Sequence, residues 1–257
     1  MEEQLCDAIV VGFVNYGESD RIIRLLTPNL GLISAISKNS RSSKHRLAGL
    51  FEVGNFLQMT LTPPYNDLWL VKDAIQKHAN TNIRKDLHKV AIMMYCCEVA
   101  QVLTLPDEPQ PKLFALLKNT LDILLDMPTP TAAFHQGFTI KALTVFGNKP
   151  QLFHCAICTG ALKDEQWFHP ILGGGVHKNC IEEESEQINQ NWLFHTPHQW
   201  FAHLNQLLHE PLAKNAQMVL PYHQRKQRSS HWLMTEILEH IIEKPLKSTS
   251  LLKPLYP

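Results

Sequence analysis

Four residues of the chain have the types and spacing of a metal site. Cys155 and Cys158 enclose two residues, and His177 and Cys180 enclose two more after a gap of 18 residues. Two residues between thiolates let both sulfurs face one tetrahedral ion, and three cysteines with one histidine are a known zinc set. The gap is usual for zinc ribbons. We therefore predict that Cys155, Cys158, His177 and Cys180 bind Zn²⁺.

Four protein ligands leave no open coordination position, which is typical of structural rather than catalytic zinc. Two alternatives stay open. The segment packs without metal, with its thiols as ordinary buried cysteines, or the three cysteines hold a catalytic zinc and His177 is free as the base of a hydrolase. His154 and His169 are substitutes for the fourth ligand, although neither stands in a pair at ligand spacing.

A second group of residues suits contacts to phosphate. No acidic residue lies between Arg21 and Phe51, whereas small hydroxyl side chains accompany the basic ones there. The whole chain has a net charge of +0, so nucleic-acid binding must depend on local charge. A solvated loop is the alternative. We predict DNA contacts from six cationic side chains: Arg21, Arg24, Lys38, Arg41, Lys44 and Arg46.

The elements that carry these basic residues read as strands. Short apolar runs separated by turn residues predict five strands, at residues 8–14, 22–26, 32–36, 54–61 and 68–71. Five strands in about 70 residues suit an OB-type barrel. Aromatic side chains on such a barrel can stack on bases. We expect Phe13 and Phe56 in the interior and Tyr16, which lies in a turn, to be exposed.

The remainder of the chain has a sequence pattern that is typical of helices. Apolar residues recur at helical spacing in residues 86–105, 112–125, 131–146 and 231–243, and prolines bound these segments. The predicted class is α+β. An N-terminal five-stranded OB-type barrel (residues 1–80) precedes a helical domain (residues 81–257) with a zinc-finger-like insertion (residues 153–181).

Composition and motifs narrow the function further. Hydrophobic residues make up 44% and charged residues 19%, as in ordinary globular domains. No nucleophile elbow, P-loop, Rossmann fingerprint or metalloprotease helix is present, so we predict no catalytic activity.

The sequence also carries information on location. No apolar run reaches the roughly 18–20 residues that span a bilayer, and residues 1–4 are acidic where a signal peptide is basic. We expect a cytoplasmic protein without membrane contact. Because that compartment is reducing, Cys6, Cys96 and Cys97 are expected to be core thiols rather than disulfides.

Several segments, taken together and in order, resemble the RecO family of DNA repair proteins. Residues 8–27, with the turn Tyr-Gly-Glu-Ser-Asp, are similar to the family's opening strands, and residues 31–46 to its next strand and basic loop. Further similar segments lie at residues 95–99, 138–150 and 246–251. The chain departs from the family pattern at His177, where zinc-bearing members have cysteine, in its lack of net basic charge, and in the acidic run at residues 182–186.

The resemblance implies a nucleoid-associated recombination mediator without catalytic chemistry. Members of the family bind single- and double-stranded DNA, anneal complementary strands, contact the C-terminal tail of single-stranded DNA-binding protein, and work with RecR to load RecA. Lys112, Lys118 and Lys141 on predicted helices are the candidates for that tail. A basic group at residues 225–228 is the fallback site for DNA.

Overall fold

The chain folds into two compact units. The structure, a computed structural model, describes residues 2–42, 44–65, 67–78, 80–105, 108–162, 166–183, 193–196, 198–218, 224–225, 228–229 and 232–256. One unit comprises Met1–Pro130 with Leu246–Leu255, and the other comprises Thr131–Pro245 with Tyr256–Pro257. The boundary between these units lies at residues 130 and 131. The predicted boundary between the barrel domain and the helical domain, at residues 80 and 81, stays a prediction.

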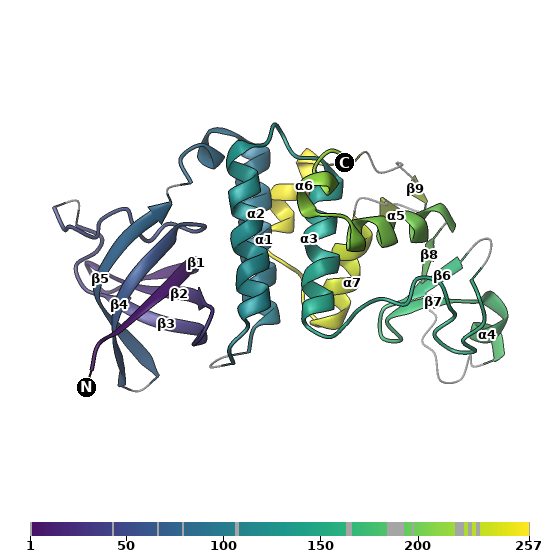
Figure 1. The fold of residues 1–257 in the computed structure, drawn as a ribbon, viewed down its shortest axis with the longest axis horizontal. Helices are drawn as coiled ribbons and strands as arrows, with labels where there is room; N and C mark the ends of the chain where they lie inside the picture. Colours follow the sequence, from purple (N-terminus) through teal and green to yellow (C-terminus); the bar gives the residue numbers. More distant parts are fainter. Residues whose placement is uncertain are drawn as a thin grey trace. The chain divides into compact units, whose positions relative to one another are not determined.

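The first unit begins with a closed five-stranded barrel (Figure 1). The strand order is β1-β2-β3-β5-β4; β3 and β5 run parallel, and the other pairs run antiparallel. The predicted OB-type barrel is therefore confirmed. Its strands are β1 (Gln4–Tyr16), β2 (Asp20–Thr27), β3 (Gly31–Ser37), β4 (Phe56–Tyr65) and β5 (Leu68–His78).

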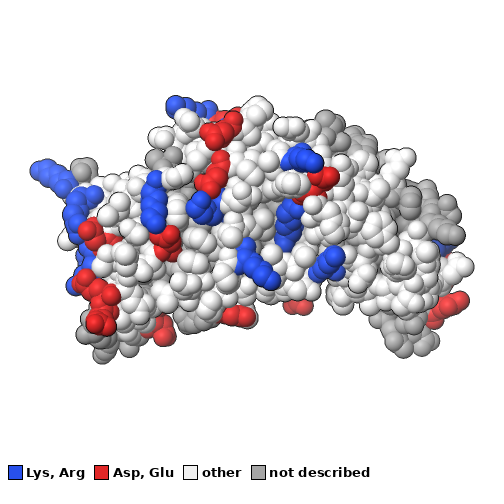
Figure 2. All heavy atoms as spheres, viewed as in Figure 1, with Lys and Arg blue, Asp and Glu red and all other residues white. Residues whose placement is uncertain are grey.

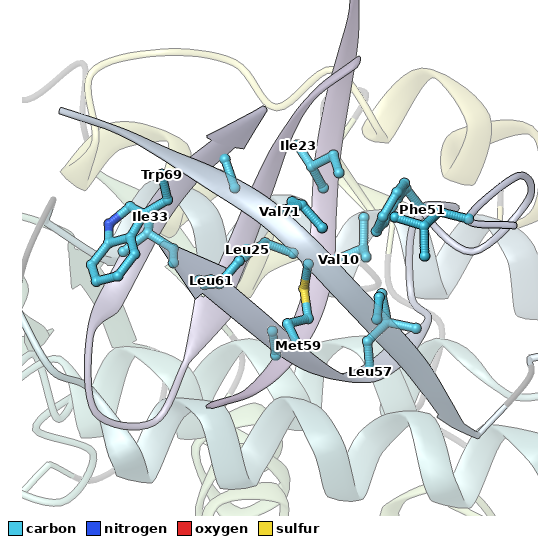
Figure 3. Packing of buried hydrophobic residues seen from close by; sticks show 14 residues of the cluster. Val10, Ile23, Leu25, Ile33, Phe51, Leu57, Met59, Leu61, Trp69 and Val71 are labelled. Carbon is cyan, nitrogen blue, oxygen red and sulfur yellow. The ribbon is translucent and has the colours of Figure 1, made fainter. Parts of the chain in front are cut away.

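Alternate residues of the strands fill the barrel. Ile23 and Leu25 of β2 are fully buried, and they meet Leu57 and Met59 of β4 inside it (Figure 3). Phe51, from the connection between β3 and β4, also enters this core. Burial of one such side chain contributes about 1.5–3 kcal/mol. The core fixes which residues of each strand face outward.

Helices complete the first unit. They are η1 (Ile83–Lys85), α1 (Leu87–Leu103), α2 (Pro111–Asp126), α8 (Thr249–Leu252) and η4 (Lys253–Leu255). The Asp86 side chain accepts hydrogen bonds from the backbone N–H groups of His88 and Lys89 and so caps α1. Pro111 stands at the first position of α2, where its missing N–H costs nothing.

A carboxylate ties α1 to the C-terminal segment. Glu98 accepts hydrogen bonds from the backbone N–H of Lys247 at 2.9 Å and of Ser248 at 2.7 Å. These amides precede α8 and have no partner within that helix. Glu98 and Ser248 belong to two of the segments that resemble the RecO family, so a hydrogen-bonded pair joins segments about 150 residues apart.

The second unit contains the remaining predicted helices and the cysteine-bearing insertion. It also contains a three-stranded antiparallel sheet of order β7-β6-β8, of which β6 and β7 lie within the predicted insertion and β8 lies beyond its end. The helix α5 was not predicted. Within the described residues, no helix is both long enough and apolar enough to span a membrane. The elements are α3 (Ala132–Val145), β6 (Gln166–His169), β7 (Gly174–Val176), α4 (Lys178–Glu183), β8 (Phe194–Thr196), α5 (His198–His209), α6 (Leu212–Asn215), β9 (Gln224–Arg225), β10 (Arg228–Ser229) and α7 (Leu233–Ile241).

Candidate metal centre and nucleic-acid interface

A tight turn presents the first two cysteines. Cys155 donates its N–H to the carbonyl of Gly160 at 2.8 Å, and Thr159 donates to the carbonyl of Cys155 at 2.9 Å. Thr159 has a φ of 60°, which lets the chain reverse within this turn. Ala156 donates to the carbonyl of Gly175 and so fastens the turn to β7. His177 follows β7 directly, and Cys180 lies on α4.

These elements bring the four predicted ligands together. One ligand atom from each of the four residues lies within 4.8 Å of all the others. His177 Nδ1 is 3.3 Å from Cys158 Sγ and 3.8 Å from Cys180 Sγ. A tetrahedral ion with Zn–S bonds of about 2.3 Å holds its ligand atoms about 3.8 Å apart. The cluster can therefore hold a metal ion.

The orientation of His177 supports this use. Its Nε2 lies 3.1 Å from the carbonyl oxygen of Ala161. Because that oxygen can only accept, Nε2 carries the hydrogen and Nδ1 is left with a lone pair that faces the cysteines. Sequence reasoning missed Ala161, since a backbone carbonyl leaves no signal in residue type.

The thiols influence one another's protonation. Burial alone would raise the pKa of Cys155, but hydrogen bonds from the backbone of Cys158, His177 and Ile157 outweigh it and lower that pKa to about 7. Burial, followed by the neighbouring Cys158 and Cys155, raises the pKa of Cys180 to about 12. Three thiolates repel one another unless a cation lies among them. This donor set therefore fits a metal ion that prefers sulfur and nitrogen.

The three glycines before His177 serve the packing of this insertion. Gly173 has a φ of +66°, which a residue with a Cβ rarely adopts. A Cβ on Gly174 would lie 2.6 Å from the Cβ of Gln151, and one on Gly175 would lie 2.7 Å from the Phe201 ring. Close approach of backbone and side chains therefore requires glycine at these positions.

The two substitute histidines lie outside the group of four. His154 is exposed, and its backbone forms an isolated β-bridge with Ala161. His169 is buried, and its Nδ1 accepts a hydrogen bond from the backbone N–H of Leu172 at 3.2 Å. The geometry favours His177 over both, and its role as the fourth ligand stays a prediction.

Three of the six predicted DNA-binding residues are paired with carboxylates. The pairs are Arg21 with Glu52 at 3.1 Å, Lys38 with Asp20 at 2.8 Å, and Arg46 with Asp73 at 2.7 Å. The hydrogen bonds from the Lys38 side chain and from the backbone of Asn39 hold the pKa of Asp20 below its usual value.

The other three residues have no carboxylate partner within the described part of the chain. Arg41 donates to the backbone carbonyls of Gly17 at 3.2 Å and Glu18 at 2.9 Å. Arg24 and Lys44 are exposed. On the face drawn in Figure 2, basic and acidic side chains are interspersed among the described residues. The barrel therefore offers scattered cations rather than one continuous basic patch on that face.

The aromatic and additional basic residues of the barrel are also placed. Tyr16 is 55% exposed, as expected, and Phe56 is buried. Phe13 is partly buried, and the Arg21 guanidinium lies 4.4 Å from the centre of its ring. Sequence reasoning missed Lys72, an exposed cation on β5 for which no ion pair occurs among the described residues. Because Asp73 follows it directly, Lys72 does not lie in an acid-free stretch of sequence.

The three lysines predicted to bind the tail of single-stranded DNA-binding protein differ in how free their ammonium groups are to bind a partner. Lys118 pairs with Asp122 at 2.7 Å, and Lys141 donates to the carbonyls of Leu208 and Glu210 at the end of α5. Burial lowers the pKa of Lys141. Lys112 is exposed. In the fallback group at residues 225–228, Lys226 lies outside the described residues.

Two family matches together cover most of the chain. The family described as "Recombination protein O N terminal" matches residues 1–75, and the family described as "Recombination protein O C terminal" matches residues 84–250. The first match spans most of the barrel. The second begins just before α1 and includes the cysteine cluster.

Curated relatives agree with these matches. A "DNA repair protein RecO" of Myxococcus xanthus is 33% identical over 188 residues, which are 73% of this chain and 77% of the relative. A protein of the same name from Dehalococcoides mccartyi is 34% identical over 67% of this chain and 68% of its own length. The fold, the order of its segments and these matches show that the chain belongs to the RecO family of DNA repair proteins.

Proposed function

We propose that this protein is a non-catalytic mediator of DNA repair that binds single- and double-stranded DNA and anneals complementary strands. The observation that carries the proposal is a closed barrel of OB type on which Arg24, Arg41 and Lys44 have no carboxylate partner among the described residues. Barrels of this type bind oligonucleotides across an outer face and its adjoining loops. Annealing requires neutralisation of phosphates on two strands without a firm grip on the bases.

All six predicted residues contribute to this site in two ways. Arg24, Arg41 and Lys44 contact phosphates directly. The side chains of Arg21, Lys38 and Arg46 leave their carboxylate partners and bind phosphates instead. Breaking an exposed ion pair such as that of Arg46 costs little free energy, because exposed pairs contribute only about 0–1 kcal/mol. Lys38 is likewise 59% exposed in its pair.

The metal of the cysteine cluster is zinc, and its role is structural. Cys155, Cys158, His177 and Cys180 supply four ligand atoms, which complete a tetrahedral shell. When bound there, zinc would hold the turn at Cys155 against β7 and α4. The hydrolase alternative is disfavoured, because His177 directs one nitrogen to Ala161 and the other to the thiols and is not free as a base.

The partners follow from the family. We propose that the protein acts in the cytoplasm at the nucleoid, works with RecR to assist RecA loading, and binds the tail of single-stranded DNA-binding protein. An apolar pocket lined by residues such as Leu143, Phe168 and Ile237 suits the apolar end of that tail. Of the three candidate lysines, Lys112 is the exposed one.

The experiment that tests the proposal is fluorescence anisotropy with a labelled single-stranded oligonucleotide, with and without RecR. The expected result is saturable binding that weakens as salt is raised. Strand annealing, followed by the fluorescence of a labelled complementary pair, should be accelerated by the same protein. Absence of binding at low salt would contradict the proposal.

A second function is favoured by the ion pairs on the barrel. A protein-interaction scaffold of the same fold would have little affinity for DNA, and the pairs of Arg21, Lys38 and Arg46 with carboxylates are consistent with it. A salt-dependent gel shift separates the two functions. The scaffold predicts no shift at any salt concentration, whereas the mediator predicts a shift that disappears as salt is raised.

A further inference from the structure

A row of aliphatic side chains crosses the outer face of the barrel. In the strand registers, Val14 of β1 is opposite Ile22 of β2, Ile22 is opposite Ile36 of β3, and Ile36 is opposite Leu70 of β5. Residues directly opposite one another on a sheet have their Cβ atoms about 4.5–5.5 Å apart. We call Val14, Ile22, Ile36 and Leu70 the aliphatic row.

The alternation of the strands shows that the row faces outward. Ile23, Ala35 and Trp69, each adjacent in sequence to a member of the row, belong to the barrel core. Neighbouring residues of a strand point to opposite faces. Val14 is 56% exposed, and the other three are partly exposed. As cross-strand pairs these side chains stabilise the sheet by only about 0.2–1 kcal/mol each, and they leave apolar surface facing solvent.

Polar and charged side chains flank the row on both sides, with at least one cation on each side. Arg24, which faces the same way as Ile22, is opposite Ser34 of β3. On the other side, Tyr16 follows Val14 on β1, and the ion pair of Asp20 with Lys38 lies beyond Ile22 and Ile36. The exposed Lys72 lies beyond Leu70, at a bulge of β5. Neither Arg24 nor Lys72 has an ion pair among the residues that the structure describes.

We propose that the aliphatic row, with Tyr16, is the surface on which unpaired bases of single-stranded DNA lie. This inference rests on the proposed function and assigns the strand preference of the same site. The cations on either side match a phosphate backbone that passes along the row, and the apolar surface between them matches the faces of bases. A protein partner with a purely apolar face would leave those cations without counterparts.

The dimensions of the row agree with this use. Four adjacent strands about 4.8 Å apart make the row about 14 Å long. Other four-stranded sheets that bind single strands hold two or three bases on a surface of this kind. Duplex DNA keeps its bases stacked inside the helix, so it can contact the flanking cations but not the row.

The test compares two double variants with matched chemistry. Val14→Ser with Tyr16→Ser removes apolar surface at the row. Leu5→Ser with Ile75→Ser removes it from β1 and β5 where they pair with β4, away from the row, and these control residues are 67% and 63% exposed. Because all four side chains are largely exposed, both variants should fold, and thermal unfolding checks this.

Affinity is measured by anisotropy for a single-stranded oligonucleotide and for its duplex. The row variant should bind the single strand about fivefold or more weakly, the loss expected from one base contact, with an unchanged salt slope and unchanged duplex affinity. The control variant should bind both as the wild type does. Equal losses on both DNAs, or none on either, would overturn the inference and leave the proposed function standing. Failure of the wild type to bind any DNA would overturn the proposed function itself.

Discussion

Removal of the His177 imidazole tests the metal centre most sharply. Its Nδ1 lies 3.3 Å from Cys158 Sγ and 3.8 Å from Cys180 Sγ, so His177→Ala removes one of four ligand atoms and leaves three thiols. Loss of a group that merely orients a ligand lowers metal affinity 10- to 100-fold. Loss of a ligand itself should lower zinc affinity by about 100-fold or more.

This loss of affinity has a counterpart in stability. At a free zinc concentration about 100 times the wild-type Kd, a 100-fold weaker Kd removes about 2.3 kcal/mol of stabilisation from the folded protein and leaves the variant only about 0.4 kcal/mol. Competition with a chromophoric chelator measures the affinity, and thermal unfolding with and without chelator measures the stability. Chelation should lower the unfolding temperature of the wild type and have little further effect on His177→Ala.

Two further variants serve as controls. His177→Cys restores four ligands as a four-cysteine set and should retain the metal. His154→Ala removes an exposed histidine that lies beside Cys155 but outside the group of four, and it should leave zinc affinity unchanged. Unchanged zinc affinity in His177→Ala, or well under one equivalent of zinc in the purified wild type, would refute the reasoning.

Three predictions concern stability and are measured by urea unfolding. Glu98→Ala should lower the free energy of unfolding by about 2 kcal/mol, because the carboxylate accepts bonds from Ser248 and its neighbour; an equal loss in Glu98→Gln would argue against this. Asp86→Ala should cost about 1 kcal/mol as a lost helix cap, and Asp86→Asn much less. Burial alone would raise the pKa of Asp86, but hydrogen bonds from Thr129 and the backbone lower it overall. The contribution of this carboxylate to stability is therefore present above about pH 4 and is lost as pH falls further. A stability difference between the wild type and Asp86→Ala that is the same at about pH 2 and at neutral pH would contradict this. Gly175→Ala should cost about 1–3 kcal/mol by overlap with the Leu162 side chain and the Phe201 ring, and a neutral effect would contradict this.

The barrel and the main helices were predictable because their periodicity is strong. Strands of the barrel alternate between core and surface, and α1, α2 and α3 begin or end near prolines and capping residues. The helix α5 was missed, although Trp200, Leu204 and Leu207 are buried at helical spacing and supplied a signal. The small sheet of β6, β7 and β8 was missed because its strands are three or four residues long.

Residue types and spacing were enough to predict the cysteine cluster, because the turn and the glycines that shape it lie close to the ligands in the sequence. The electrostatics of the basic stretch were harder to predict. Asp20 and Glu52 lie one residue beyond the two ends of the acid-free interval, and Asp73 comes from another strand. A count within a window of sequence cannot detect such partners, because strand pairing decides which charges meet.

The central claim is that the barrel binds single-stranded DNA through its cationic side chains. The most direct test is the slope of log affinity against log salt. Each phosphate neutralised on a single strand contributes roughly −0.7, so three direct contacts imply a slope of about −2 and six imply about −4. Substitution of Arg24, Arg41 and Lys44 together by alanine should weaken binding for all sequences alike and shallow the slope by about 2. An unchanged affinity and slope in this variant would contradict the account.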